Sequence, residues 1–291
     1  MRKLAIVSLL AALGLSNGAA GQTASSPGST LRIALVGQAL IHEDLRRVAP
    51  LNVEQAKGYL KGADVRFTNL ETALAPKDIA VELRTPDVHR TGPEVLDALK
   101  DMGFNLLSLS NNHAWDLGAK GLLATIGEVS KRGFVHAGTG PDVDAAAAAG
   151  YMDTPAGKVA LVAMASGAAQ LANPDTWAAP GRPGVNYLDL RADGTLDPTQ
   201  KARILGAVRD AARKAKFVIV YQHNHFWGEA TGVEAPPNRN TSVNRLDTAP
   251  WLVAWTHELI DAGASVYVAH GPVSQGVEIY KGRPILYGLG N

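Results

Sequence analysis

Short apolar runs alternate along the chain with longer segments whose apolar residues recur every three to four positions. The first pattern predicts buried strands, at 31–36, 64–68, 104–109, 134–137, 158–164, 217–221 and 266–269. The second predicts helices, at 44–60, 94–102, 119–132, 142–149, 198–214 and 249–262. Two further apolar runs flank Lys281 and Gly282 and predict a hairpin with a two-residue turn. Because strands alternate with helices, we expect a fold of the α/β class.

The N-terminal segment has the features of an export signal. Arg2 and Lys3 precede an apolar stretch over 4–15, and small residues follow at 18–20. We therefore expect residues 1–20 to be a signal peptide that is removed on export, which places the protein in the periplasm or outside the cell. An uncleaved N-terminal anchor is the alternative. Residues 21–30 are small and polar and are expected to form a linker to a domain over 31–291.

Composition narrows the classes of partner and ligand. The 291 residues are 46% hydrophobic, which is enough for one sizeable core. Lysine and arginine number 28 against 27 acidic residues. The chain therefore lacks the excess of positive charge that is typical of proteins that bind nucleic acid. The chain contains no cysteine, so a bound metal ion would depend on histidine, asparagine, aspartate or glutamate.

Polar side chains follow five of the predicted strands. They are Gln38, Asn69 with Glu71, Asn112 with His113, His223 with His225, and His270. In α/β folds the carboxyl ends of the strands form the edge where ligands bind, so we expect these side chains to lie together. Carboxylate, amide and imidazole groups suit a divalent Mn, Fe, Zn or Mg ion. The alternative is that Asn112 caps the following helix and His113 is only a turn residue.

Several motifs resemble those of the CapA family, which is associated with capsule and poly-γ-glutamate synthesis. The motifs are 69–71, 110–114 with Asp116 and Gly118, the histidine-rich turn that ends at Trp227-Gly228, and 270–278 with 286–291. The resemblance runs from about residue 31 to residue 291. It implies a layered α/β/β/α sandwich similar to calcineurin-like metallophosphoesterases. The family normally continues beyond the last motif, so the C-terminus could be truncated.

The resemblance also implies metal ligands. Such phosphoesterases typically hold two metal ions at the strand ends, and the ligands of one ion match residues of this chain. Those residues are Glu71, Asn112, His223 and His270. His225 is the substitute for His223, because one of the two is expected to point away. His113 matches the histidine that acts beside the leaving group, and Asp116 could orient its ring.

The ligands of the other ion are not preserved. Gln38 stands where the family has aspartate, and Val273 stands where it has the last histidine of the terminal motif. Both losses fall on the same ion. We therefore expect one divalent metal ion, with weak phosphodiesterase activity at most, because a single ion cannot bind both the attacking and the leaving oxygen.

Two kinds of function remain open at this stage. The first is a metal-dependent hydrolase or transferase that acts on a phosphate or amide bond in an envelope polymer or a small substrate, alongside the capsule-synthesis machinery. The second is a non-catalytic protein that binds or helps to export a sugar or acidic polymer. The long loops predicted at 75–93, 166–190 and 231–248 suit the second function, as do aromatic residues near them: Trp177, Phe226, Trp227 and Trp251. Ordinary packing is the alternative explanation for these aromatics.

Overall fold

The structure, a computed structural model, describes residues 30–75, 88–226, 248–271 and 274–290. The expected signal peptide and nearly all of the linker lie outside these residues, as do Trp227, Val273 and most of the loop expected at 231–248. None of the helices in the described part of the chain has the length and apolar character that a membrane span requires.

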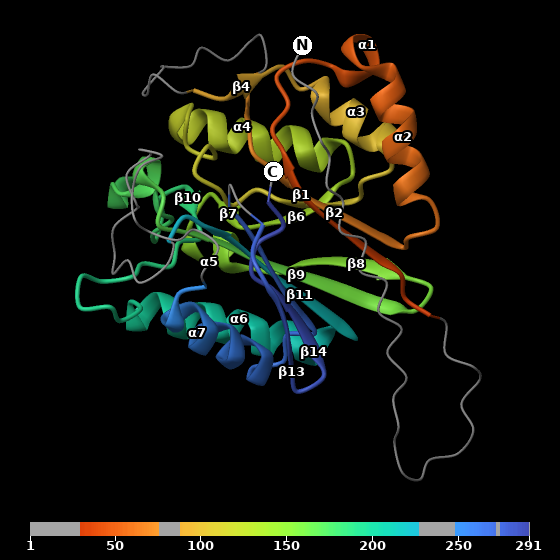
Figure 1. The fold of residues 1–291 in the computed structure, drawn as a ribbon. Coiled ribbons are helices and arrows are strands. Elements are labelled where there is room, and N and C mark those ends of the chain that lie inside the picture. Colours follow the sequence, from red (N-terminus) through yellow and green to blue (C-terminus); the bar gives the residue numbers. More distant parts are fainter. Residues whose placement is uncertain (1–29, 76–87, 227–247, 272–273, 291) are drawn as a thin grey trace.

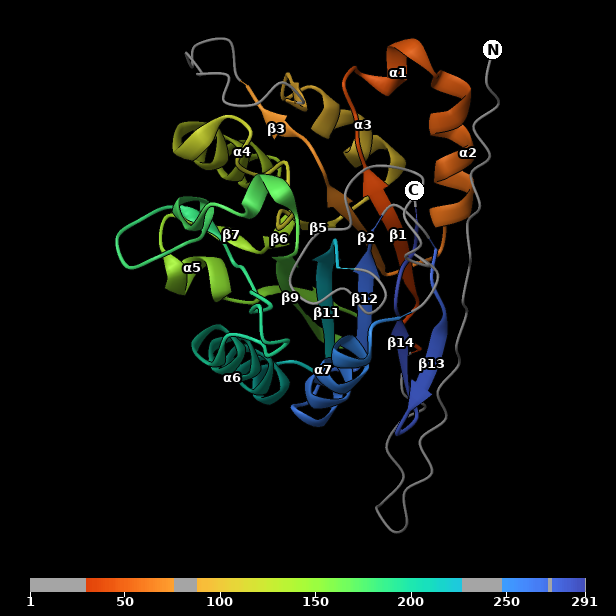
Figure 2. The ribbon, with the colours of Figure 1, turned by 60° about the vertical axis from the view of Figure 1, so that its left-hand side comes forward.

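Two sheets pack face to face at the centre of the molecule (Figures 1 and 2). The first sheet is fully parallel and has the strand order β1-β2-β5-β6. Its strands are β1 (Ile33–Ala39), β2 (Val65–Leu70), β5 (Leu106–Ser108) and β6 (Val135–Ala137).

The second sheet has six strands in the order β13-β14-β12-β11-β9-β8. The strands are β8 (Gly150–Thr154), β9 (Gly157–Ser166), β11 (Phe217–Asn224), β12 (Val266–His270), β13 (Val277–Tyr280) and β14 (Arg283–Leu286). The four inner strands run parallel, and β8 and β13 each pair antiparallel at an edge. Two small sheets pair β3 (Ala73–Leu74) with β4 (Arg90–Thr91) and β7 (Thr139–Gly140) with β10 (Gly184–Val185).

Helices cover the outer face of each sheet, as Figure 1 shows. The first sheet carries α1 (Leu45–Val48), α2 (Pro50–Leu60), α3 (Val95–Met102) and α4 (Gly118–Lys131). The second carries α6 (Pro198–Lys214) and α7 (Pro250–Asp261), and the short α5 (Val143–Ala147) contacts β7 and β9. The turns Ala169–Leu171 and Pro174–Thr176 are short 3₁₀ helices.

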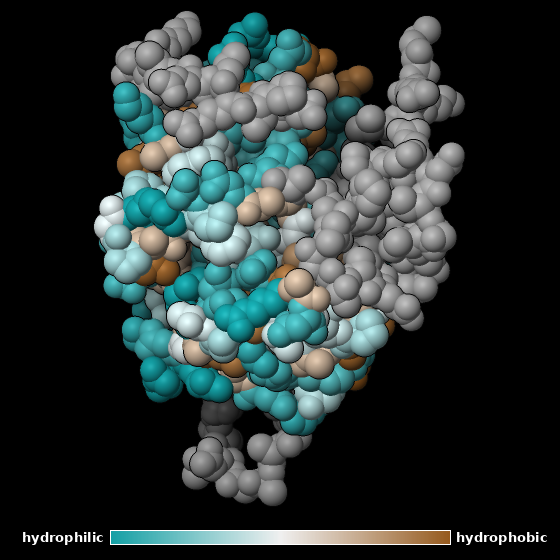
Figure 3. Space-filling model, turned by 90° about the vertical axis from the view of Figure 1, so that its left-hand side faces the viewer, coloured by the Kyte–Doolittle hydropathy of each residue, from teal (hydrophilic) through white to brown (hydrophobic). Residues whose placement is uncertain are grey.

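Neighbouring apolar residues on a strand face opposite layers, because side chains alternate along a strand. Leu106 packs between the sheets, whereas Leu107 packs under the helices of the first sheet. In the same way, Ile219 packs between the sheets, whereas Val220 packs under α6 and α7. The molecule is therefore an α/β/β/α sandwich, as expected. On the face in Figure 3 the described residues are mostly hydrophilic, with hydrophobic ones in small separate groups.

Some elements differ from the sequence prediction. The helix expected over 44–60 is broken at Ala49, which has φ −147° and ψ 55°, because the ring of Pro50 disfavours helical backbone at the preceding residue. No element was predicted over 150–154, and this segment forms the edge strand β8. The hairpin around Lys281 and Gly282 is confirmed, and both turn residues have positive φ.

Candidate metal centre

Side chains from four separate segments meet at one edge of the sandwich. Glu71 directly follows β2, His223 lies near the end of β11, and His270 is the last residue of β12. Asn112 lies in the loop between β5 and α4. Ligand atoms of Glu71, His223 and His270 all lie within 4.8 Å of one another, and the three residues are buried.

We call Glu71, Asn112, His223 and His270 the Glu71 cluster. Polar atoms of their side chains lie close to one another. The Nε2 atom of His223 lies 2.8 Å from Oδ1 of Asn112 and 3.8 Å from Oε1 of Glu71. The other carboxylate oxygen, Oε2, lies 3.5 Å from Nε2 of His270. The structure thus brings together the residues expected to be ligands. Their role as ligands stays a prediction.

His225 also lies at this cluster, and the expectation that one histidine of the pair points away was wrong. Its Nε2 atom is 2.9 Å from Nε2 of His223, and the ring centroids are 4.7 Å apart. The reason is that residues two positions apart on an extended segment share a face. His225 is not among the residues whose ligand atoms lie within 4.8 Å of one another.

Burial controls the charge state of the cluster. It raises the pKa of Glu71 to about 8, although a hydrogen bond from Asn69 opposes this shift. Burial lowers the pKa of His223 well below its ordinary value, and burial together with the nearby His225 lowers the pKa of His270 to about 4. The imidazoles are therefore neutral at pH 7, which is the form that binds metal ions.

The donor set fits a divalent cation. In the described part of the chain, the partners of the Glu71 carboxylate are Asn69 and neutral imidazoles, and no lysine or arginine pairs with it. A buried carboxylate without a cation is costly, and a bound cation would remove that cost. One carboxylate, one amide oxygen and two imidazole nitrogens suit borderline ions such as Zn, Fe or Mn.

Gln38 is aimed at the same cluster by an irregularity in β1. The register between β1 and β2 gains one residue on β1 between Leu35 and Gln38, so the strand bulges beside the site. The hydroxyl of Thr68 donates to the Gly37 carbonyl and holds this bulge. A Cβ atom at residue 37 would lie only 2.6 Å from the Gly290 carbonyl oxygen, so glycine permits the close approach. Gln38 Oε1 then lies 2.8 Å from Nε2 of His270.

His113 belongs to a second, adjoining group of histidines. Its Nδ1 atom lies 2.8 Å from Oδ2 of Asp116, and the same oxygen accepts a hydrogen bond from the His89 backbone N–H. The His89 ring packs edge-on against the His113 ring, with centroids 4.0 Å apart. Nδ1 of His89 lies 3.1 Å from Nε2 of His42. Asp116 thus contacts the ring that it was predicted to orient, and its role stays a prediction.

Two residues at the site were not foreseen. Tyr221 places its hydroxyl 3.4 Å from Nδ1 of His223, on the side of the ring away from Asn112. It was seen only as an apolar strand residue, although its position two residues before His223 puts both on one face. His89 lay in a segment expected to be a surface loop, and no pattern in the sequence distinguished it.

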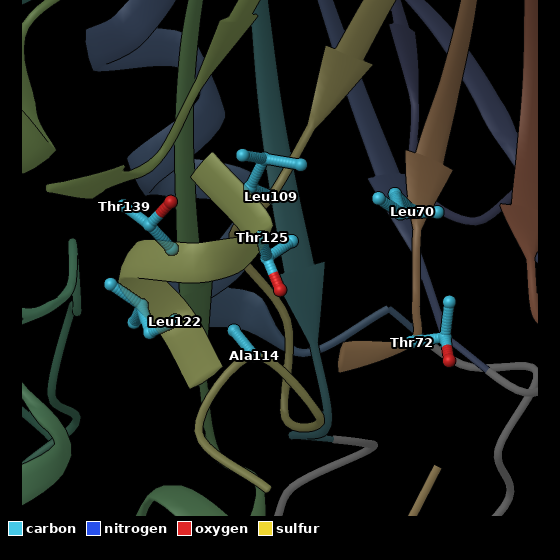
Figure 4. Close-up of a pocket in the computed structure, with 7 residues that line it drawn as sticks. All are labelled: Leu70, Thr72, Leu109, Ala114, Leu122, Thr125 and Thr139. Atoms are coloured by element: carbon cyan, nitrogen blue, oxygen red, sulfur yellow. The ribbon is translucent and has the colours of Figure 1, made fainter. Parts of the chain in front are cut away.

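A small cavity is lined by residues of β2 and the turn after it, the loop between β5 and α4, α4 and β7 (Figure 4). Its lining is apolar apart from threonine hydroxyls, and consists of Leu70, Thr72, Leu109, Ala114, Leu122, Thr125 and Thr139. It holds none of the cluster residues. Three of the aromatic residues considered for polymer binding make ring contacts within the described part of the chain: Trp177 stacks on Tyr187, and Phe226 contacts Trp251 edge-on.

Comparison with known proteins places the chain among capsule-related proteins. An "Uncharacterized protein" of Sinorhizobium fredii is 29% identical and covers 93% of this chain and 68% of its own length. A "Probable polyglutamine synthesis accessory protein" of Mycobacterium tuberculosis is 32% identical over 78% of this chain, and the "PGA biosynthesis protein CapA" of Bacillus subtilis is 29% identical over 79%. This chain spans 55% and 57% of the length of these last two proteins.

A crystal structure of a hypothetical protein from Thermus thermophilus aligns with 89% of this chain and 76% of that one, at 17% identity and a TM-score of 0.48. Residues 32–291, which include every residue of the Glu71 cluster, match the family described as bacterial capsule synthesis protein PGA_cap. The chain therefore belongs to this capsule synthesis family.

Proposed function

We propose that the chain is an exported envelope protein that uses one divalent metal ion to hydrolyse a phosphate or amide bond. The observation that carries the proposal is the Glu71 carboxylate, which is buried among Asn112, His223 and His270 with no basic side chain paired to it in the described residues. When bound, the ion would act as a Lewis acid on a substrate oxygen and would make a water molecule a better nucleophile.

The remaining roles fall to side chains of this chain. Glu71, Asn112, His223 and His270 would hold the ion. His113, whose Nδ1 is engaged by Asp116, would present its other ring nitrogen to the substrate and donate a proton to the leaving group. Asp116 is buried and its carboxylate also accepts the His89 backbone N–H, so it is held against the His113 ring.

The names of the relatives suggest the class of substrate. Proteins named for capsule and polyglutamine synthesis imply an acidic or sugar polymer of the envelope, or a smaller phosphate- or amide-linked precursor. An exported location agrees with the basic and apolar pattern of residues 1–20. N-terminal sequencing of protein from the envelope fraction tests the location, and recovery of an intact Met1 would contradict removal of a signal.

Hydrolysis is tested with the purified mature chain after removal of metal ions and reloading with Mn²⁺, Zn²⁺, Fe²⁺ or Mg²⁺. The substrates are a chromogenic phosphodiester and a γ-glutamyl anilide. We expect slow, metal-dependent turnover that disappears in Glu71→Gln. Turnover that persists in a chelator, or that is unchanged in Glu71→Gln, would refute the proposed centre.

A second candidate function is a non-catalytic accessory protein that binds envelope polymer. The observation that favours it is Gln38, which occupies the place of a family aspartate and contacts His270 through a neutral amide. Sedimentation of the metal-free chain with poly-γ-glutamate or capsular polysaccharide tests this function. Binding without any turnover under all metal conditions would favour it over hydrolysis.

A further inference from the structure

Two fully buried asparagines connect the segments that carry the Glu71 cluster. Asn69 is in β2, Asn111 is in the loop after β5, and the side chains of both are inaccessible to solvent. The Nδ2 atom of Asn111 donates to Oδ1 of Asn69 at 3.1 Å and to the Leu70 carbonyl at 2.7 Å. Nδ2 of Asn69 in turn donates to Oε2 of Glu71 at 2.9 Å.

The chain of hydrogen bonds continues on the other side of Asn111. Its Oδ1 atom accepts the backbone N–H of His113 at 3.1 Å, so the side chain closes the turn that contains Asn112. A continuous path thus runs from the Glu71 carboxylate through Asn69 and Asn111 to the turn that presents Asn112 and His113. Each amide uses both its oxygen and its nitrogen in this path.

We propose that Asn69 and Asn111 are positioning residues, which fix the Glu71 carboxylate and the Asn112–His113 turn relative to each other before a metal ion binds. The inference rests on the proposed metal centre but not on hydrolysis. Asn69 holds Oε2, and this leaves Oε1 directed at His223. Partners outside the coordination sphere are known to orient metal ligands in this way, and their loss commonly weakens metal binding about 10- to 100-fold.

Asn105 is an asparagine that links β2 and β5 without contacting the Glu71 cluster. It lies at the opposite end of β2 and β5, where Oδ1 accepts the Arg66 N–H at 2.8 Å and Nδ2 donates to the Asp64 carbonyl at 2.9 Å. Both of its bonds go to backbone atoms. Asn69 and Asn111 differ, because the path they form ends on a carboxylate of the cluster. Asn105 therefore provides a matched control for the loss of an inter-strand amide.

The test compares Asn69→Leu with Asn105→Leu. Leucine keeps the branched shape of asparagine and removes both of its polar atoms. The affinity for Co²⁺ is measured by titration, and the visible absorption of the bound ion reports its coordination geometry. We expect Asn69→Leu to bind Co²⁺ about 10- to 100-fold more weakly with an altered spectrum. Asn105→Leu should lose stability but keep the affinity and spectrum of the unmodified protein.

Crystal structures of the metal-free variants give a readout that needs no ion. In Asn69→Leu the Glu71 carboxylate should turn from its present orientation, whereas in Asn105→Leu it should stay. If Asn69→Leu fails to fold, Asn111→Asp replaces it, because aspartate keeps the bond to the His113 N–H and loses the donors to Asn69 and Leu70.

An unchanged Glu71 orientation together with unchanged Co²⁺ affinity and spectrum would overturn the inference. A lack of Co²⁺ binding by the unmodified protein would instead refute the proposed metal centre, and the crystal structures would still decide whether Asn69 positions Glu71.

Discussion

The side-chain oxygen of Gln38 lies 2.8 Å from Nε2 of His270, at the point where β1 bulges toward the Glu71 cluster. The resemblance to metallophosphoesterases implies an aspartate at this position. An amide oxygen brings no charge, so it cannot offset the repulsion between two divalent ions about 3.5–4 Å apart. In this structure the amide oxygen of Gln38 instead contacts Nε2 of His270.

We predict that the mature chain binds one divalent ion. Elemental analysis of dialysed protein measures the number of ions per chain, and Glu71→Gln should reduce it to nearly zero. In the double variant Gln38→Asp, Val273→His, the restored carboxylate and imidazole should admit a second ion. Two ions in the unmodified protein would contradict the prediction, and an ion retained by Glu71→Gln would exclude Glu71 as an essential ligand.

The metal-free protein should lose stability as the pH rises from 6.5 to 8. The folded protein raises the pKa of Glu71 from 4.5 to about 8, so its stabilising effect is complete below pH 4.5 and disappears as the pH passes through 8. The lowered pKa values of His223 and of His270, which is about 4, act in the opposite direction, mainly below pH 7. Between pH 6.5 and pH 8 the effect of Glu71 is the larger one, and we expect a net loss of about 1 kcal/mol.

Urea unfolding of the metal-free protein at several pH values measures this loss. Glu71→Gln provides the control, because glutamine does not titrate, and its stability should vary less over the same range. Saturating Zn²⁺ should also flatten the profile of the unmodified protein, since the ion stabilises the charged carboxylate. Parallel profiles for the metal-free protein and the variant would show that Glu71 does not titrate as its burial implies.

The α/β class could be predicted because hydrophobic periodicity distinguishes strands from helices, whereas the layered sandwich was implied by the family resemblance. The helix over 198–214 has the predicted bounds, since Asp197 caps it and apolar positions recur along one side. The strand predicted to end at Tyr221 continues to Asn224, because Gln222, His223 and Asn224 are polar and yet buried. Periodicity cannot recognise a strand whose polar residues are satisfied by partners distant in sequence, such as Trp255, which donates to Gln222.

The candidate residues could be found from the sequence because each lies at a strand end, and parallel strands bring those ends to one edge. The choice of the Glu71 cluster among them was implied by the family resemblance. The orientation of each side chain could not be predicted from the sequence. The approach of His89 to His113, and the bulge that aims Gln38 at His270, depend on contacts between segments that are far apart along the chain. No local rule encodes these contacts, so they appear only in the folded structure.

We predict that His113→Ala keeps the metal ion and loses at least 100-fold in turnover, because general acid catalysis contributes about 10²–10⁴-fold. Asp116→Asn should have a smaller effect, since asparagine can still accept from Nδ1 of His113 but no longer stabilises a charged ring. Metal content and turnover are measured on the same preparations. Loss of the ion in His113→Ala would show that His113 is itself a ligand.

The last prediction concerns Tyr221, whose hydroxyl lies 3.4 Å from Nδ1 of His223. If Nε2 of His223 binds the ion, Nδ1 must hold the proton and can donate it to this hydroxyl, which fixes the tautomer. Tyr221→Phe removes the acceptor and keeps the ring, which packs 5.2 Å from the Phe67 ring between the sheets. We expect metal affinity to fall about tenfold. This is the lower end of the roughly 10- to 100-fold range for hydrogen-bond partners of metal ligands, because the bond is long.

Tyr267→Phe is the matched control for this prediction. Tyr267 is equally buried, but its hydroxyl donates to Gln222 on the opposite face of the second sheet. Its loss should lower stability by about 1 kcal/mol and leave metal affinity unchanged. The ¹⁵N chemical shifts of the histidine rings report the tautomer directly. If Tyr221→Phe leaves both the His223 tautomer and the affinity unaltered, the hydroxyl serves packing alone and the proton on Nδ1 has another partner.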